Sequence, residues 1–190
     1  LGDIQNTTAF PIRNDLKRRT PGACVRSTGR PWDTIDRAAS LPQPMRHLFE
    51  PSLVNGPEGD PALYIDLRGE RRALLLDLGD IAALPPRKLL RLTHVFVSHA
   101  HMDHFAGFDT LLRVVLCRKD RLVLVGGPGF VDRVEHRLLA YTWNVVHRYA
   151  VPLQLDVRAW APDGSGRRAS FSSRSGFVRE SDARWPVADG

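Results

Sequence analysis

The chain has 190 residues and a mass of 21.3 kDa, the size of one ordinary domain with extra segments at its ends. Hydrophobic residues make up 43% and charged residues 25%, which allows a packed core and excludes a chain that is disordered throughout. The net charge is +6, but residues 45–160, where core-like patterning lies, carry 15 basic and 13 acidic side chains. The basic excess is therefore weak evidence for a nucleic-acid footprint.

Membrane and secretory features are missing from the sequence. No apolar run reaches the roughly 18–20 residues that a membrane helix needs, and no secretion signal is recognisable at the start of the chain. Only two cysteines, Cys24 and Cys117, are present, and they are too far apart for a disulfide framework. These features predict a cytoplasmic protein with no membrane partner.

Three zones differ in their patterning. Residues 1–44 contain five prolines and no sustained apolar period, which predicts an irregular N-terminal tail; a basic arm that binds a polyanion is the functional alternative. Residues 45–160 carry the core-like pattern and are predicted to form the domain. Residues 161–190 have isolated apolar residues among Gly, Ser, Arg and Asp, which predicts an irregular C-terminal segment, either a surface hairpin and loop or a frayed end.

Strand and helix patterns alternate through the central zone. Five segments have the alternation or the short apolar run of a strand: Leu63–Leu67, Arg72–Leu78, His94–Ser98, Leu122–Val125 and Leu153–Val157. Three segments have helical spacing or a helical start: Pro85–Leu92, Gly107–Leu116 and Phe130–Tyr141. This alternation predicts an α/β sandwich.

The most informative segment is Ser98-His99-Ala100-His101-Met102-Asp103-His104, which follows a predicted buried strand. Positions i and i+2 after a strand lie on the same side, so His99 and His101 can present two imidazoles to one cation. Asp103 and His104 precede the next predicted helix and can bind a second cation a few ångströms away. These ligands suit Zn²⁺, and also Fe or Mn²⁺, and two such ions lower the pKa of a bridging water. Surface histidines in a polar turn are the alternative, which the position between a strand and a helix disfavours.

The segment Ser98–Gly107 resembles the signature of the metallo-β-lactamase superfamily. The upstream Leu74–Gly79, a strand that ends in Asp and Gly, matches that superfamily's first motif. Within the superfamily the sequence is most similar to ribonuclease Z and its relatives, on His94–Ser98, on the helix after the signature and on Leu122–Gly129. The resemblance covers residues 45–160 and implies an α/β (α+β) fold of the αββα sandwich type.

This resemblance implies a metal-dependent hydrolase, a ribonuclease Z-like phosphodiesterase or endonuclease that uses a two-metal-activated water. His99 and His101 would bind one metal, Asp103 and His104 the other, and Asp103 would also accept a proton as the catalytic residue. Asp77 would orient a metal-binding histidine, with a plain strand-end turn residue as the equal alternative. The implied cofactor is Zn²⁺, with Mn²⁺ or Fe as alternatives, and the implied partner is a phosphodiester substrate such as RNA or tRNA.

The sequence departs from the family pattern in two places. The family completes its site with a downstream His, a bridging Asp and a last His, whereas the later histidines here, His136 and His147, lie in or just after the helix predicted over 130–141. The chain thus resembles the N-terminal half of a family member. Such a half is expected to be inactive alone. It would also expose an apolar face of its sheet, which predicts association, for example as a homodimer. Asp80–Ala83 replaces a Glu-Gly-Thr-Gln-like stretch, which weakens the case for tRNA and leaves other phosphodiesters open.

Two other functions are compatible with these sequence features. One is an iron-dependent redox member of the same superfamily, which would share the histidine signature. The other is a catalytically incomplete fragment or binding module that keeps half of a metal site. The identity of the bound metal distinguishes the redox member from a hydrolase. A measurement of hydrolytic activity distinguishes the incomplete fragment from a hydrolase.

Overall fold

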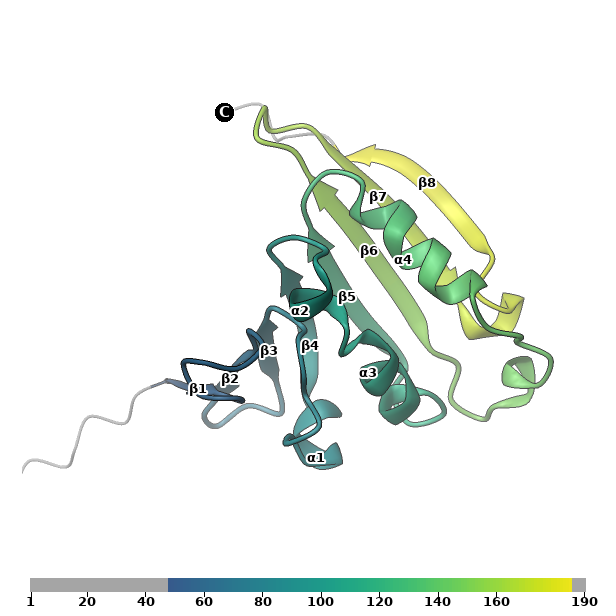
Figure 1. Ribbon diagram of the computed structural model, residues 1–190. Helices are drawn as coiled ribbons and strands as arrows, with labels where there is room; N and C mark the ends of the chain where they lie inside the picture. Colours follow the sequence, from purple (N-terminus) through teal and green to yellow (C-terminus); the bar gives the residue numbers. More distant parts are fainter. Residues whose placement is uncertain (1–47, 186–190) are drawn as a thin grey trace, which may run out of the picture. The chain divides into compact units, whose positions relative to one another are not determined.

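Alternating apolar residues build one mixed sheet in the computed structural model, which describes residues 48–185 (Figure 1). Eight strands lie in the sheet in chain order: β1 (Phe49–Leu53), β2 (Leu63–Leu67), β3 (Ala73–Leu76), β4 (Leu92–Val97), β5 (Arg121–Gly126), β6 (Gln154–Trp160), β7 (Gly166–Ser172) and β8 (Arg179–Trp185). The helical elements are α1 (Pro86–Leu89), α2 (Met102–Phe105), α3 (Phe108–Val115) and α4 (Phe130–Leu139), with single 3₁₀ turns at η1 (Val146–Arg148) and η2 (Ser173–Ser175). The tail predicted over residues 1–44 lies outside the described residues.

The handedness of the connections places the helices on one face of the sheet. The central strands β3 to β6 pair in parallel, and the remaining strands pair antiparallel. Each parallel pair is joined through a helical crossover, by α1, then by α2 and α3, then by α4. Because the strand order advances in one direction and such crossovers are right-handed, each helix falls on the same side. Figure 1 shows α2, α3 and α4 together on that side.

The core lies between the sheet and this helical layer. Fully buried residues of the central strands alternate along their lengths: Leu75, Val95, Leu122, Leu124, Leu155 and Val157. The helices bury one face each at helical spacing: Phe108, Leu111, Leu112 and Val115 on α3, and Phe130, Val131, Val134 and Leu138 on α4. On the other face of the sheet, Leu76 is 38% exposed and Phe96 is 37% exposed.

The predicted fold class is confirmed. Residues 48–185 form one mixed sheet with one helical layer, the two kinds of layer that an αββα sandwich contains twice. None of the helices within these residues has the length and apolar character needed to cross a bilayer.

The predicted central elements are present, with differences at their ends. β3 ends at Leu76 and not at Leu78, because the next residue, Asp77, has a φ of 60° and leaves the strand conformation. α1 is confined to Pro86–Leu89, since Leu92 already begins β4. β1 was not predicted, because all five of its residues are exposed and show no apolar alternation.

The C-terminal segment is regular, so the irregular structure predicted over residues 161–190 is wrong for β7 and β8. The two strands form an antiparallel pair at the sheet edge, which is the hairpin alternative and extends the domain past residue 160. Arg167 Nη1 lies 3.0 Å from Asp132 of α4, and Arg179 Nε lies 3.0 Å from Glu135 of the same helix. These ion pairs add to the burial of only two apolar side chains of β7, Ala169 and Phe171, so the apolar pattern by which strands are recognised is short in this hairpin.

A close backbone approach joins the segment after β3 to the segment after β4. Gly107 N donates to Leu78 O at 2.9 Å, and Leu78 N donates to His104 O at 2.9 Å. A Cβ atom on Gly107 would lie 2.1 Å from Gly79 O, and one on Gly79 would lie 2.3 Å from Asp103 O. Both positions therefore require glycine, and the two sequence motifs are held in direct contact.

We expect Gly107→Ala to lower the free energy of unfolding by about 2–3 kcal/mol, because the added methyl group forces the two backbones apart. Gly127→Ala is the matched control, since its Cβ would meet only Ser98 O, at 3.7 Å. Urea unfolding followed by far-UV circular dichroism measures both. Equal destabilisation by the two substitutions would contradict the close approach.

A buried carboxylate lies on the face of the sheet without helices. Asp156 is 2% exposed and accepts hydrogen bonds from Arg121, Arg158 and Arg168 at 3.1, 3.0 and 2.9 Å. Burial raises the pKa of Asp156, but the three arginines outweigh burial and lower this pKa from 3.8 to about 2. The carboxylate therefore stays ionised wherever the protein is folded at ordinary pH.

This depressed pKa predicts acid sensitivity. The stabilisation by Asp156 is complete above its unfolded pKa near 3.8 and is lost as the pH falls towards its folded pKa of about 2. The difference corresponds to about 2 kcal/mol of stability at neutral pH. Asp156→Asn should abolish this part of the pH dependence and lower the free energy of unfolding at pH 7 by about 3 kcal/mol, because three arginines lose their counter-charge. Urea unfolding between neutral and acid pH tests both; the same acid slope in both proteins would contradict the assignment.

Candidate metal centre

The predicted site residues meet at the carboxyl ends of two neighbouring parallel strands. β3 and β4 pair in parallel, Asp77 follows β3, and His99 and His101 follow β4. Asp103 and His104 come next, in α2, a single helical turn and not the irregular turn expected before the helix. Ends of parallel strands meet at one edge of a sheet, where α/β proteins place their ligands.

The first pair of predicted ligands is already in contact. The ring centroids of His99 and His101 lie 4.3 Å apart, and His99 Nε2 lies 3.0 Å from His101 Nδ1. Two nitrogens bound at 2.0–2.1 Å to a tetrahedral zinc are separated by about 3.3 Å. The two imidazoles therefore have the donor chemistry and nearly the spacing of two ligands of one cation.

The second pair of predicted ligands, Asp103 and His104, is joined to the first through His104, so the four side chains form one group, the histidine cluster. The ring centroid of His104 lies 4.1 Å from that of His99, and His104 Nε2 lies 3.4 Å from Asp103 Oδ2. His104 Nδ1 lies 3.1 Å from Asp77 Oδ2 and 3.2 Å from Ser98 Oγ. Asp77 and Ser98 thus hold one ring nitrogen, which leaves the other directed towards Asp103.

Asp77 sits in a conformation that its surroundings impose. Its φ of 60° is in the left-handed region, which non-glycine residues rarely adopt. Asp77 N donates to Phe96 O at 2.7 Å, and Asp77 Oδ1 accepts from Ser98 N at 2.8 Å and from Ser98 Oγ at 2.7 Å. Asp77 therefore turns the chain at the end of β3 and contacts His104, and its role in orienting a metal-binding histidine stays a prediction.

The side chains of the histidine cluster contact one another in pairs and do not form a complete set of ligands around one metal ion. Within residues 48–185, no three His, Cys, Asp or Glu side chains surround one common point. A catalytic zinc takes three protein ligands and a structural zinc takes four, so a complete coordination shell needs further donors. His136, in α4, and His147, in η1, are exposed, and neither lines the cavity of His99 and His101.

Aromatic packing connects the cluster to the next helix. The ring of Phe105, in α2, lies 5.2 Å from that of Phe108 and 5.4 Å from that of Phe130 at the start of α4. Phe130 packs on the bare backbone of Gly126, where a Cβ would lie 2.3 Å from its ring. The helix that carries Asp103 and His104 is therefore positioned against α4. The sequence does not indicate this connection, because nothing local marks Phe130 as a neighbour of α2.

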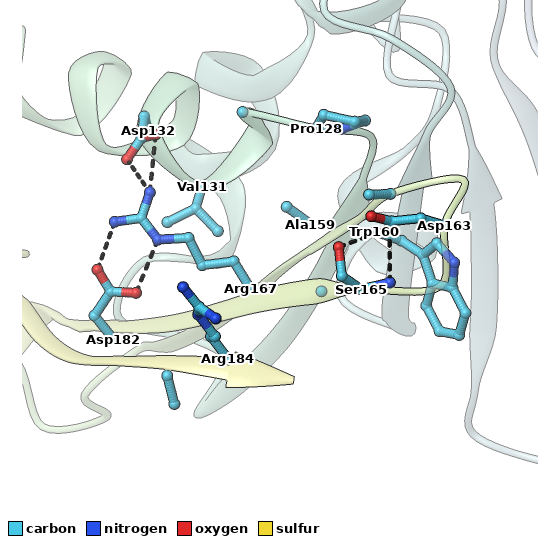
Figure 2. A pocket seen from close by; sticks show the side chains of 14 residues that line it. Pro128, Val131, Asp132, Ala159, Trp160, Asp163, Ser165, Arg167, Asp182 and Arg184 are labelled. Atoms are coloured by element: carbon cyan, nitrogen blue, oxygen red, sulfur yellow. Dashed lines mark hydrogen bonds and ion pairs between the residues drawn. The ribbon is translucent and has the colours of Figure 1, made fainter. Parts of the chain in front are cut away.

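Two cavities flank the loop Gly127–Gly129, which joins β5 to α4. The smaller, of about 250 Å³, is lined by His99 and His101 on one side and by Gly127, Pro128 and Arg133 on the other. The larger, of about 760 Å³, lies beyond Pro128, between the start of α4 and the turn from β6 to β7 (Figure 2).

The larger cavity has its charges largely neutralised. Figure 2 shows Arg167 between Asp132 and Asp182, and its guanidinium pairs with both, at 3.0 Å for Asp132 Oδ2 and 2.9 Å for Asp182 Oδ1. No histidine lines this cavity. The smaller cavity, which is lined by His99 and His101, is therefore the candidate site of chemistry.

Comparison with known proteins agrees with the resemblance seen in the motifs. The chain is 37% identical over 103 residues to ribonuclease Z of Deinococcus radiodurans, covering 51% of this chain and 31% of that protein. It is 29% identical over 151 residues to ribonuclease Z of Bradyrhizobium diazoefficiens, covering 70% of this chain and 48% of that protein. The matched part thus spans less than half of each of these relatives, and no protein-family model matches the chain.

A solved structure similar to the chain is human tRNase Z, short form. It has 22% sequence identity and a TM-score of 0.42, and the likeness covers 60% of this chain and 44% of that one.

Proposed function

We propose that this chain, which is related to ribonuclease Z over 103 aligned residues, provides the histidine-rich part of a metal-dependent hydrolase that cleaves phosphodiester bonds. The observation that carries the proposal is the contact of His99 with His101 and with His104 at one edge of the sheet. Imidazole and carboxylate donors suit Zn²⁺, with Mn²⁺ and Fe as alternatives.

Each residue of the cluster has a separate part in this proposal. His99 and His101 bind one ion, and Asp103 with His104 binds the second. Divalent ions held there supply an activated water at neutral pH and positive charge opposite the phosphate oxygens. Asp103, whose side chain is 54% exposed, is accessible to take the proton of the attacking water. Asp77 holds His104 Nδ1 at 3.1 Å and so keeps the other ring nitrogen available as a ligand.

The remaining ligands come, in this proposal, from a segment outside residues 48–185, because the described donors form only pairs. The proposed substrate is an RNA phosphodiester, since the relatives in sequence are named ribonuclease Z. The chain by itself is expected to hydrolyse phosphodiesters slowly, because a half-complete shell positions neither the ion nor the water.

Replacing His99 and His101 together by Ala should abolish tight zinc binding, because this removes both ligands of one ion. Zinc content after dialysis, measured by elemental analysis, and titration with a zinc indicator check the result. The matched control replaces the exposed His136 and His147 by Ala and should leave zinc binding unchanged. Unchanged zinc content in the His99 and His101 variant would reject the site, and bound iron with visible absorbance would favour the redox alternative.

Replacing Asp77 by Ala should weaken zinc binding by about 10- to 100-fold, because His104 loses the carboxylate that orients its ring. Asp77→Asn should lie between Ala and the unaltered chain, since the amide oxygen can still accept from Ser98 N. Asp80→Ala removes a neighbouring exposed carboxylate that does not contact His104, and it should have little effect. Equal zinc affinities for the Asp77 and Asp80 variants would contradict the orienting role.

A further inference from the structure

One arginine of α4 lies beside the histidine cluster without a carboxylate partner. Arg133 lines the same cavity of about 250 Å³ as His99 and His101. Its side chain is exposed, and within residues 48–185 its guanidinium makes no hydrogen bond or ion pair. No acidic side chain lines this cavity. An uncompensated guanidinium therefore faces the same space as the predicted ligands.

The pairing of its neighbours explains why Arg133 is left over. Asp132 and Glu135, which flank it on α4, are bound by arginines of β7 and β8. Arg137, one turn further along the helix, is paired with Asp109 of α3 at 2.8 Å. The carboxylates near Arg133 on this helix are thus already committed to other arginines.

Two glycines of the loop beside Arg133 leave room for a ligand. A Cβ atom on Gly127 would meet only Ser98 O, at 3.7 Å, and one on Gly129 would have nothing within 4 Å. Pro128 is therefore the single residue of this loop with a side chain, and the glycines on either side of it leave the space next to their backbone open. A cavity of about 250 Å³ is slightly smaller than sites for drug-sized molecules, so it suits one small polar group attached to a longer chain that leaves past the loop.

We propose that Arg133 binds a substrate phosphate at the histidine cluster, and that the ligand of this cavity is the sugar–phosphate backbone of a single-stranded nucleic acid. This inference rests on the proposed function and names the residue that recognises the substrate. The planar guanidinium donates two parallel hydrogen bonds to phosphate oxygens and keeps its charge at any physiological pH. Because a contact to a phosphate reads no base edge, binding through Arg133 is independent of base sequence.

Fluorescence anisotropy of a fluorescein-labelled oligouridylate of about ten nucleotides tests this, in EDTA and at several salt concentrations between about 50 and 200 mM. Arg133→Ala should weaken binding by about tenfold and reduce the slope of log affinity against log salt by about 0.7, the effect of one lost phosphate contact on a single strand. Arg133→Lys should keep the salt slope but lose part of the affinity, because an ammonium group cannot bind the phosphate in a bidentate way. Arg113→Ala removes an exposed arginine of α3 that does not line this cavity and is the matched control.

Equal affinities and salt slopes for the Arg133 and Arg113 variants would overturn the inference, and so would a lack of oligonucleotide binding by the unaltered chain. An oligoadenylate of the same length should bind with the same affinity and the same dependence on Arg133; a strong base preference would overturn recognition through the backbone. EDTA separates this test from the proposed function, which depends on zinc binding by His99 and His101. If the unaltered chain binds no zinc but Arg133→Ala still weakens RNA binding, the phosphate site is supported and the metal site is rejected.

Discussion

The contact between the backbones of Gly79 and Gly107 holds the two parts of the candidate site together. It joins the turn after β3 to the segment after α2, and hydrogen bonds of Leu78 on either side keep the two chains in register. Any side chain at either glycine would separate them. The carboxylate of Asp77 reaches His104 only because the chains approach this closely, so the geometry of the histidine cluster depends on this contact.

The one-sided helical layer has a consequence for the opposite face of the sheet. Right-handed crossovers between successive parallel strands leave Leu76 and Phe96 partly exposed there, beside the arginines that surround Asp156. The homodimer expected from the sequence stays a prediction, and a second helical and sheet layer of the αββα type would cover the same residues.

Arginine has different roles in different parts of the molecule. Around Asp156 three arginines stabilise one buried carboxylate, and at the sheet edge Arg167 and Arg179 attach the hairpin to α4. These arginines are neutralised by carboxylates of the chain itself, so the net charge of +6 does not describe a uniform basic surface. Arg133 differs because its neighbouring carboxylates are taken, and its position beside the histidines makes its charge available to a ligand.

The sequence by itself determined the features that depend on local spacing. The alternation of strands and helices, the two imidazoles of His99 and His101 on one side of a strand end, and the Asp–Gly turn after β3 follow from covalent geometry over a few residues. Only the tertiary structure decided what lies next to them. The sequence left a hairpin and a frayed end open for the C-terminal segment, and the ion pairs of β7 and β8 with α4 favour the hairpin. Arg133 escaped prediction because the pairing of β4 with β5 brings α4 to the histidines. Such neighbours are set by strand pairing and packing between distant segments, which leave no periodic signal in the chain.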